Sequence, residues 1–139
     1  MDKGRILQPF FFILFILLSI YLLTHYQSSK HSELLNDTCF SFGNIKTDIH
    51  TNPKSSLNNY YVDYYFFVNQ DRYNGVYSIE KNIISKSFFI ENFAGHRFPI
   101  IYCCNEINNN RLLILPEDFN EFNIPFPDSL NWVKQFIRK

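Results

Sequence analysis

The sequence predicts a mainly β fold, an antiparallel sheet or small barrel of about five to six strands, with an N-terminal transmembrane helix and a C-terminal amphipathic helix. Three observations predict this class. Residues 6–26 contain no Asp, Glu, Lys or Arg. The 113 residues that follow suffice for one small domain and are too few for two. Within them, strand-like segments come first and a helical segment last, an order that favours antiparallel pairing.

The apolar segment near the N-terminus is long enough to cross a lipid bilayer. As a helix, residues 6–26 would span about 31 Å, close to the thickness of the hydrocarbon core. Twelve of the fourteen residues from Phe10 to Leu23 are Phe, Ile or Leu. A cleaved signal peptide would need a pair of small residues after Leu23, which the sequence lacks. A buried core helix would be more polar on one face. We therefore expect an uncleaved signal anchor.

This anchor divides the chain into three parts. Residues 1–26 form the anchor, which contacts the lipid bilayer through residues 6–26. Residues 27–37 form a polar juxtamembrane linker, and residues 38–139 form the β-rich domain with its C-terminal helix. Basic side chains on the short N-terminal flank favour a cytoplasmic N-terminus. The domain is then expected outside the cytoplasm, in a single-pass protein of the cell membrane.

Strand-like alternation is clearest in the first half of the domain. A first strand is expected over residues 38–45 and a polar loop over 47–59. Residues 60–68 carry the strongest strand signal, because every second residue is apolar or aromatic. A short turn leads to a strand over 72–79, in which Gly75 marks a bulge or a point of close packing.

The next segment is less regular. Alternation over residues 81–91 fits a third strand. Residues 97–104 fit a further strand, in which Pro99 indicates an edge position or a strand beginning. A polar loop over 105–110 and a short buried strand over 112–115 follow.

The C-terminal tail differs in kind. Pro116 and the two acids after it fit the start of a short helical turn. Asp128 can cap an amphipathic helix over residues 129–138, whose apolar stripe would pack on the sheet.

Composition argues against two classes of ligand. Beyond the anchor the chain carries eleven basic and twelve acidic side chains without a basic cluster, which argues against nucleic-acid binding. His31, His50 and His96 are scattered and no paired-cysteine motif is present, so no metal site is expected. No common nucleotide-binding or hydrolase motif occurs, and no cofactor is expected.

The chain has three cysteines, Cys39, Cys103 and Cys104. An odd number does not give a complete disulfide framework. Outside the cytoplasm, Cys39 could pair with Cys103 or with Cys104. Adjacent residues in a strand point to opposite faces, so at most one of the two would aim toward Cys39. Small buried thiols are the favoured alternative.

Aromatic side chains are the remaining candidates for a binding site. A row of exposed tyrosines could stack against a sugar or a peptide. The candidates are Tyr61, Tyr65, Tyr73 and Tyr77. Packing of these rings in the core is the favoured alternative. Glu117, Asp118 and Glu121 fit the first turn of a helix better than a catalytic pair.

One set of motifs resembles a known group of proteins. Residues 64–69 read Tyr-Tyr-Phe-Phe-Val-Asn, Tyr73-x-Gly75 follows, and residues 95–102 read Gly-His-Arg-Phe-Pro-Ile-Ile-Tyr. This pattern resembles small single-pass bacterial membrane proteins of unknown function, over roughly residues 60 to 135. Cys103-Cys104 departs from it, where polar residues are expected. The resemblance implies a membrane-tethered β domain and carries no catalytic residue across.

Three functions remain as hypotheses. The first is a membrane-tethered, non-enzymatic interaction or structural domain of the cell envelope, with a protein partner and no nucleic acid. The second is an envelope enzyme or accessory factor that uses the thiol of Cys103 or Cys104. The third is a sugar-binding envelope domain, which requires two of the four tyrosines to be exposed side by side.

Overall fold

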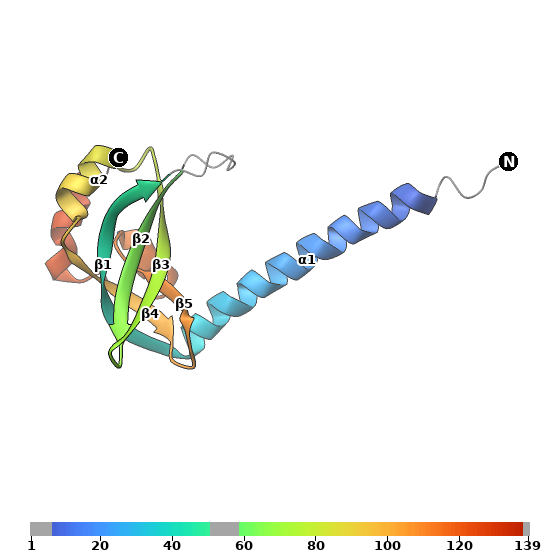
Figure 1. The fold of residues 1–139 in the computed structure, drawn as a ribbon, viewed down its shortest axis with the longest axis horizontal. Coiled ribbons are helices and arrows are strands. Elements are labelled where there is room, and N and C mark those ends of the chain that lie inside the picture. Colours follow the sequence, from blue (N-terminus) through green and yellow to red (C-terminus); the bar gives the residue numbers. More distant parts are fainter. Residues whose placement is uncertain (1–6, 51–58, 138–139) are drawn as a thin grey trace.

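The computed structural model describes residues 7–50 and 59–137. Figure 1 shows one long helix, α1, leaving the β domain and touching it at its C-terminal end. The elements in chain order are α1 (Leu7–Asn36), β1 (Thr38–His50), β2 (Asn59–Val68), β3 (Asp71–Glu80), α2 (Lys86–Phe93), β4 (Arg97–Cys103), β5 (Glu106–Leu112), α3 (Pro116–Glu121) and the 3-10 helix η1 (Asp128–Phe136).

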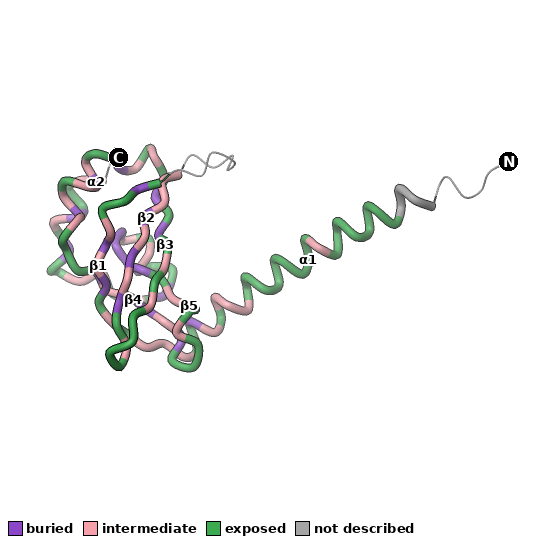
Figure 2. The backbone as a smooth tube through the Cα atoms, viewed as in Figure 1, coloured by how far each residue is buried: buried purple, intermediate pink, exposed green. Residues whose placement is uncertain are grey.

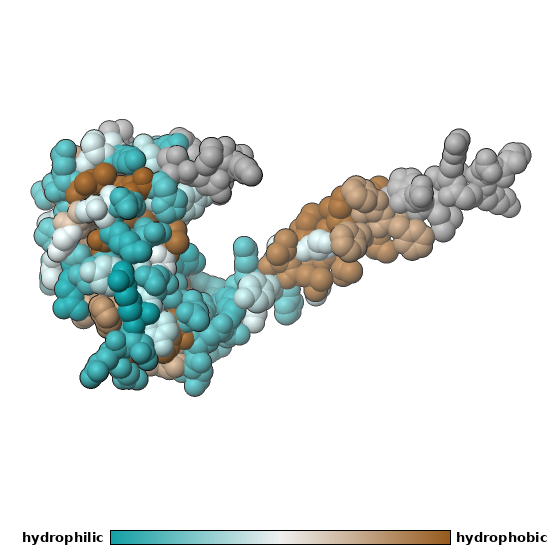
Figure 3. Space-filling view, viewed as in Figure 1, coloured by the Kyte–Doolittle hydropathy of each residue, from teal (hydrophilic) through white to brown (hydrophobic). Residues whose placement is uncertain are grey.

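The helix α1 has an apolar outer part and a polar part next to the domain (Figure 3). Its 30 residues rise about 45 Å. Most of its length is exposed (Figure 2), and the helix is long and apolar enough to cross a membrane. It also continues through most of the expected linker, residues 27–37, because this segment has no Gly or Pro to end it. The linker is therefore a rigid extension of the apolar segment.

The last turns of α1 are fixed to the β domain. Leu34 is buried in the core. The amide of Asn109 on β5 donates to the backbone oxygen of Lys30 at 2.9 Å. Just beyond the helix, the carboxylate of Asp37 accepts hydrogen bonds from the backbone N–H and the side-chain amide of Asn105, at 3.2 and 2.6 Å. The backbone oxygen of Asp37 accepts one from the N–H of Cys104 at 3.0 Å. These bonds hold the helix against β4 and β5.

The five strands form one antiparallel sheet in the order β3-β2-β1-β4-β5. The sheet curls until β3 contacts β5, so the fold is a nearly closed barrel, as the sequence predicted. Strands β2 and β3 are joined by a two-residue turn at Asn69 and Gln70, which have φ values of 50° and 74°. Positive φ at both positions is typical of a type I′ hairpin, whose twist matches that of the strands.

Gly75 lies where the barrel closes. It pairs with Tyr64 across the β2–β3 ladder. A Cβ at Gly75 would lie 2.2 Å from Cζ of Tyr64 and 2.7 Å from Oδ1 of Asn110 on β5. The Tyr64 hydroxyl donates to that Asn110 oxygen at 2.6 Å, and burial raises the pKa of Tyr64, so it remains a donor. Of the two alternatives predicted for Gly75, a bulge or close packing, the structure shows close packing.

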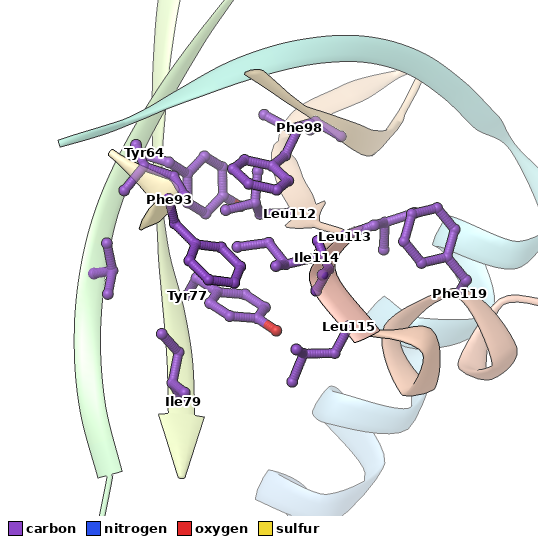
Figure 4. Packing of buried hydrophobic residues seen from close by; sticks show 14 of the residues in the cluster. Tyr64, Tyr77, Ile79, Phe93, Phe98, Leu112, Leu113, Ile114, Leu115 and Phe119 are labelled. Atoms are coloured by element: carbon purple, nitrogen blue, oxygen red, sulfur yellow. The ribbon is translucent and has the colours of Figure 1, made fainter. Parts of the chain in front are cut away.

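The core fills the barrel and continues under the short helices (Figure 4). The ring of Phe93 on α2 lies 4.7 Å from that of Phe89, 5.9 Å from that of Phe98 on β4 and 5.2 Å from that of Trp132 on η1, measured between centroids. Aromatic contacts of this kind add stability beyond their buried area. They fasten α2 and η1 to the barrel.

The expected third strand over residues 81–91 is wrong, because residues 86–93 form the helix α2. Helical spacing places Phe89 and Phe93 four residues apart on one face, where their rings stack and are buried. Over so short a segment, apolar residues match both a strand and a helix pattern. Burial against the barrel decides in favour of the helix.

The expected loop over residues 105–110 is also wrong, because residues 106–112 form β5. Its asparagines, which are typical of loops, instead bond across the fold to Lys30 and Tyr64. Of the strand expected over 112–115, only the first residue belongs to β5. The rest is buried outside the sheet.

The expectation for Pro99 is wrong, because Pro99 neither begins its strand nor lies at an edge of the sheet. Strand β4 sits between β1 and β5, and Pro99 is its third residue. The ladder to β5 starts at the next residue, Ile100, while the oxygen of Pro99 accepts a hydrogen bond from the N–H of Leu113 at 2.9 Å. Ile100 and Ile101 are both fully buried, so both faces of β4 are covered.

Two further bounds differ from expectation. β1 extends to His50, so residues 47–50 are strand and not loop; residues 51–58 of that loop lie outside the described residues. The C-terminal helix is the 3-10 helix η1, which begins at Asp128 and not after it. Asp128 does not cap it; its Oδ1 accepts a hydrogen bond from the amide of Asn131 at 3.1 Å.

The closure of the barrel gives the first prediction. We expect Gly75→Ala to lower the free energy of unfolding by about 1–3 kcal/mol, because the new methyl group overlaps a buried ring that its hydrogen bond holds in place. Urea unfolding of the full chain in detergent measures this, with Asn74→Ala at the exposed neighbouring position as the control. Equal stability of the two variants would contradict the close packing.

Candidate functional site

Four aromatic side chains gather on the outer face of β1 and β2. Gly43 and Phe66 are paired and face the core. Their chain neighbours therefore point outward, and Phe42 and Phe67 lie on the same outer face with Phe40 and Tyr65. We call this group the aromatic patch. Its members are Phe40, Phe42, Tyr65 and Phe67.

The phenylalanines of the patch expose large apolar side chains on a sheet face where polar residues are usual. The exposed fractions of Phe40, Phe42 and Phe67 are 62%, 55% and 52%. The rings of Tyr65 and Phe67 meet edge to face with centroids 6.0 Å apart. Scattered apolar residues are ordinary on protein surfaces, but three exposed phenylalanines on two paired strands are typical of a contact surface.

Two arginines flank the patch. The guanidinium of Arg72 lies 4.2 Å from the ring centroid of Tyr65, and that of Arg97 lies 5.8 Å from the ring centroid of Phe42. A guanidinium over a ring is held by cation–π attraction and keeps its N–H groups free for an acceptor. The patch therefore combines apolar area with donors that suit carboxylates.

The structure does not bring the four candidate tyrosines together. Tyr61 and Tyr65 lie half-buried on the outer face, four residues apart, with Asp63 between them. That separation along a strand is about 13 Å. Tyr73 and Tyr77 point inward; Tyr73 packs against Phe66, and Tyr77 is 5% exposed. No two of the four lie side by side on the described surface.

Cys39 and Cys104 form a disulfide with a Cα–Cα distance of 5.2 Å, which joins the start of β1 to the turn just after β4. Sequence reasoning left this pairing open and favoured buried thiols. Cys103 keeps a thiol; it is buried, with its sulfur 3.5 Å from a carboxylate oxygen of Asp37. As expected, only one of the two neighbouring cysteines aims toward Cys39, although β4 ends at Cys103 and Cys104 lies in the turn after it. Of the two thiols that the enzyme hypothesis named, Cys104 is bonded in the disulfide, and only the buried Cys103 keeps a free thiol.

Of the three acidic residues of α3, Glu117 and Asp118 lie in its first turn and Glu121 ends it, and Asp118 makes hydrogen bonds that hold the fold together. Its Oδ2 accepts hydrogen bonds from the N–H groups of Ile114 and Leu115, at 2.9 and 2.8 Å, and from the hydroxyl of Tyr77 at 2.7 Å. Burial raises the pKa of Asp118, while these donors act in the opposite direction. Burial also raises the pKa of Tyr77, which keeps its proton. These contacts fix the turn into α3 and explain Asp118 without catalysis.

The histidines are separate in the structure too. His31 is 3.5 Å from Glu121, measured from Nδ1 to Oε1. His96 is exposed, with its ring centroid 4.9 Å from that of Trp132. Within residues 7–50 and 59–137, no group of three His, Cys, Asp or Glu side chains is placed to hold a metal ion.

Compared with models of protein families, with curated proteins and with solved structures, the chain gives no match. The resemblance to small bacterial membrane proteins therefore stays a prediction.

Sequence reasoning missed the aromatic patch. Alternation along a strand places Phe40 and Phe42 on one face of β1, but alternation alone does not say which face is covered. The signal lies in the small size of their neighbours in β1, which are Cys39, Ser41 and Gly43. Such small side chains suit an inner face that is crowded by Ile100, whose Cδ1 would lie 2.2 Å from a Cβ at Gly43.

The cysteine arrangement gives the second prediction. We expect no thiol of the folded, non-reduced protein to react with iodoacetamide, because Cys103 is buried and the other two cysteines are bonded. Denaturant alone should expose one thiol per chain, and denaturant with reductant all three. Mass spectrometry counts the adducts. Modification of the folded chain would restore the thiol hypothesis.

The third prediction concerns Asp118. Because its pKa is raised in the folded state, the folded chain binds this proton more tightly than the unfolded chain. The associated stability is present below the unfolded value of 3.8 and is lost as the pH rises through the folded pKa. We expect the free energy of unfolding of the wild type, minus that of Asp118→Asn, to fall with rising pH. Urea unfolding at several pH values measures it; a difference that grows with pH would contradict the dominance of burial.

Proposed function

We propose that this chain is a single-pass membrane protein of the cell envelope, whose β domain is a non-enzymatic module that binds a partner protein outside the cytoplasm. The aromatic patch carries this proposal. It offers rings for apolar contact and two guanidinium groups for carboxylates, the residue types enriched at protein interfaces. The partner surface would present apolar side chains beside acidic ones.

Two other features support the location. An exposed apolar helix of this length is stable in a bilayer and costly in water. The disulfide between Cys39 and Cys104 favours an oxidising compartment, which the cytoplasm is not. With the basic N-terminal flank inside, the domain would lie on the oxidising side.

The fixed junction between α1 and the domain suits a tethered module. The patch lies near the start of β1, which begins two residues after α1 ends. Its height above the bilayer and its direction would therefore be set by the helix. A partner in the same membrane would meet the patch in one orientation, which lowers the entropy lost on binding.

Site-specific photo-crosslinking in native membranes tests the proposal. A photoreactive phenylalanine analogue at position 42 should give a discrete crosslinked product. Adding Phe40→Ser and Phe67→Ser should reduce its yield by roughly 30-fold, equivalent to about 2 kcal/mol for the loss of interface anchors.

The control places the same analogue at Val76, which is 57% exposed on β3. Val76 pairs with Asp63, four residues along β2 from Phe67, and so lies outside the patch. Crosslinking that is equal at the two positions, or that survives both serine substitutions, would refute the patch as the binding surface.

A further inference from the structure

A cleft lies between α1 and β5, where α1 leaves the domain and continues toward its apolar segment. It has a volume of about 360 Å³. The buried side chain of Leu34 lies at its inner end. The polar residues that line it are Tyr26, Gln27, Lys30 and His31 on α1 and Asn109, Asn110 and Arg111 on β5.

The position of the cleft along α1 matches the head groups of a bilayer. Tyr26 and Lys30 lie three and seven residues beyond Leu23, the end of the apolar run, which is about 4.5 and 10 Å along the helix. The polar layer on each side of the hydrocarbon core is about 5–8 Å thick. The bond from Asn109 to the oxygen of Lys30 brings β5 to the same level. If α1 spans the membrane, the cleft opens into the head-group layer.

The cleft is rich in donors that suit a phosphate group. Lys30 contributes an ammonium and Arg111 a guanidinium from the facing strand. Arg111 is half exposed and contacts Glu121 through one nitrogen at 3.5 Å, a contact that leaves its other nitrogens unengaged by Glu121. Guanidinium and ammonium groups form short, charge-assisted hydrogen bonds with phosphate oxygens.

Acidic side chains balance these cations. Lys30 pairs with Glu106, and its ammonium lies 3.6 Å from Glu33. Arg111 and His31 both approach Oε1 of Glu121, at 3.5 Å. A site with such balanced charge does not favour a net anion. Glu33 and Glu106 line a neighbouring cleft, so Glu121, which contacts the lining residues His31 and Arg111, is the carboxylate beside this one. The arrangement suits a zwitterion, with the phosphate toward Lys30 and Arg111 and an ammonium toward Glu121.

We infer that this cleft binds the head group of a zwitterionic phospholipid with a primary ammonium group, a phosphoethanolamine lipid. A choline group lacks the N–H donors that this carboxylate would accept from, and a glycerol head group lacks the positive charge. This inference rests on the proposed membrane anchoring and deepens it, because the lipid would fill the joint between the anchor and the domain.

Retention of lipid by the full chain tests the inference. The protein is reconstituted in phosphatidylcholine nanodiscs that contain a minor fraction of phosphatidylethanolamine or of phosphatidylglycerol, and native mass spectrometry identifies the lipid that stays bound after transfer to detergent. We expect one phosphatidylethanolamine to be retained in preference to the other two lipids. Arg111→Gln should lower its retention about tenfold through the loss of charge-assisted hydrogen bonds.

The matched control is Lys46→Gln combined with Lys134→Gln, which removes two positive charges outside the cleft lining and should leave retention unchanged. Arg111→Gln leaves the Asn109–Lys30 bond intact, and Lys30→Gln serves as a second variant. Protection of the buried Cys103 thiol from iodoacetamide shows that each variant is folded. Equal retention by Arg111→Gln and wild type, or preference for phosphatidylglycerol, would overturn the inference.

Competition with a soluble head-group compound distinguishes a lipid site from a site for any phosphate ester. Glycerophosphoethanolamine, added in an amount equal to the lipid, should not displace it; displacement would overturn the lipid assignment. Alkaline carbonate extraction separates this inference from the proposed anchoring. A chain that stays in membranes without lipid preference refutes the cleft alone, whereas a chain released by carbonate refutes the anchor.

Discussion

The junction between α1 and the barrel is the constraint on which the rest of the structure depends. Asp37 makes hydrogen bonds through both its carboxylate and its backbone oxygen to the segment that follows β4. Leu34 enters the core one helical turn earlier, and the disulfide of Cys39 closes the joint two residues later. Three kinds of interaction therefore fix the same few residues. Without them, the helix would be a tether with no defined direction.

The barrel achieves closure with few polar groups. Tyr64 spans the interior to bond Asn110, and Gly75 leaves the space its ring needs. Among the described residues, no buried side-chain nitrogen or oxygen lacks a hydrogen-bond partner. The other contacts that close the barrel are apolar, and α2 and η1 contribute aromatic rings to them. A barrel of five strands thus gains additional buried area from the helices, which a domain of this size needs for stability.

The sequence predicted the fold class and the parts of the chain whose patterns have one interpretation. The alternating aromatics of β2 and the long apolar run of α1 are such patterns. It failed where two patterns coincide or where distant partners decide. Phe89 and Phe93 fit both a strand and a helix until the barrel covers them, and Asn109 and Asn110 suggest a loop until Lys30 and Tyr64 lie opposite.

The candidate site was harder to predict for a similar reason. Alternation along a strand separates two faces but does not say which face is covered. Tyr73 and Tyr77 proved to be inner residues, while Phe40 and Phe42 proved to be outer ones. Likewise, three cysteines allow several pairings, and only the approach of β1 to the end of β4 selects Cys39 and Cys104.

The unbroken path of α1 from its apolar segment into the domain has a rotational consequence. Each residue of an α-helix turns the chain by about 100° and advances it about 1.5 Å. The number of residues between Leu23 and Leu34 therefore sets the rotational orientation of the whole β domain about the helix axis. An insertion or deletion of one residue there would hardly alter the height of the domain, yet it would turn the phenylalanine-bearing strands toward a different neighbour.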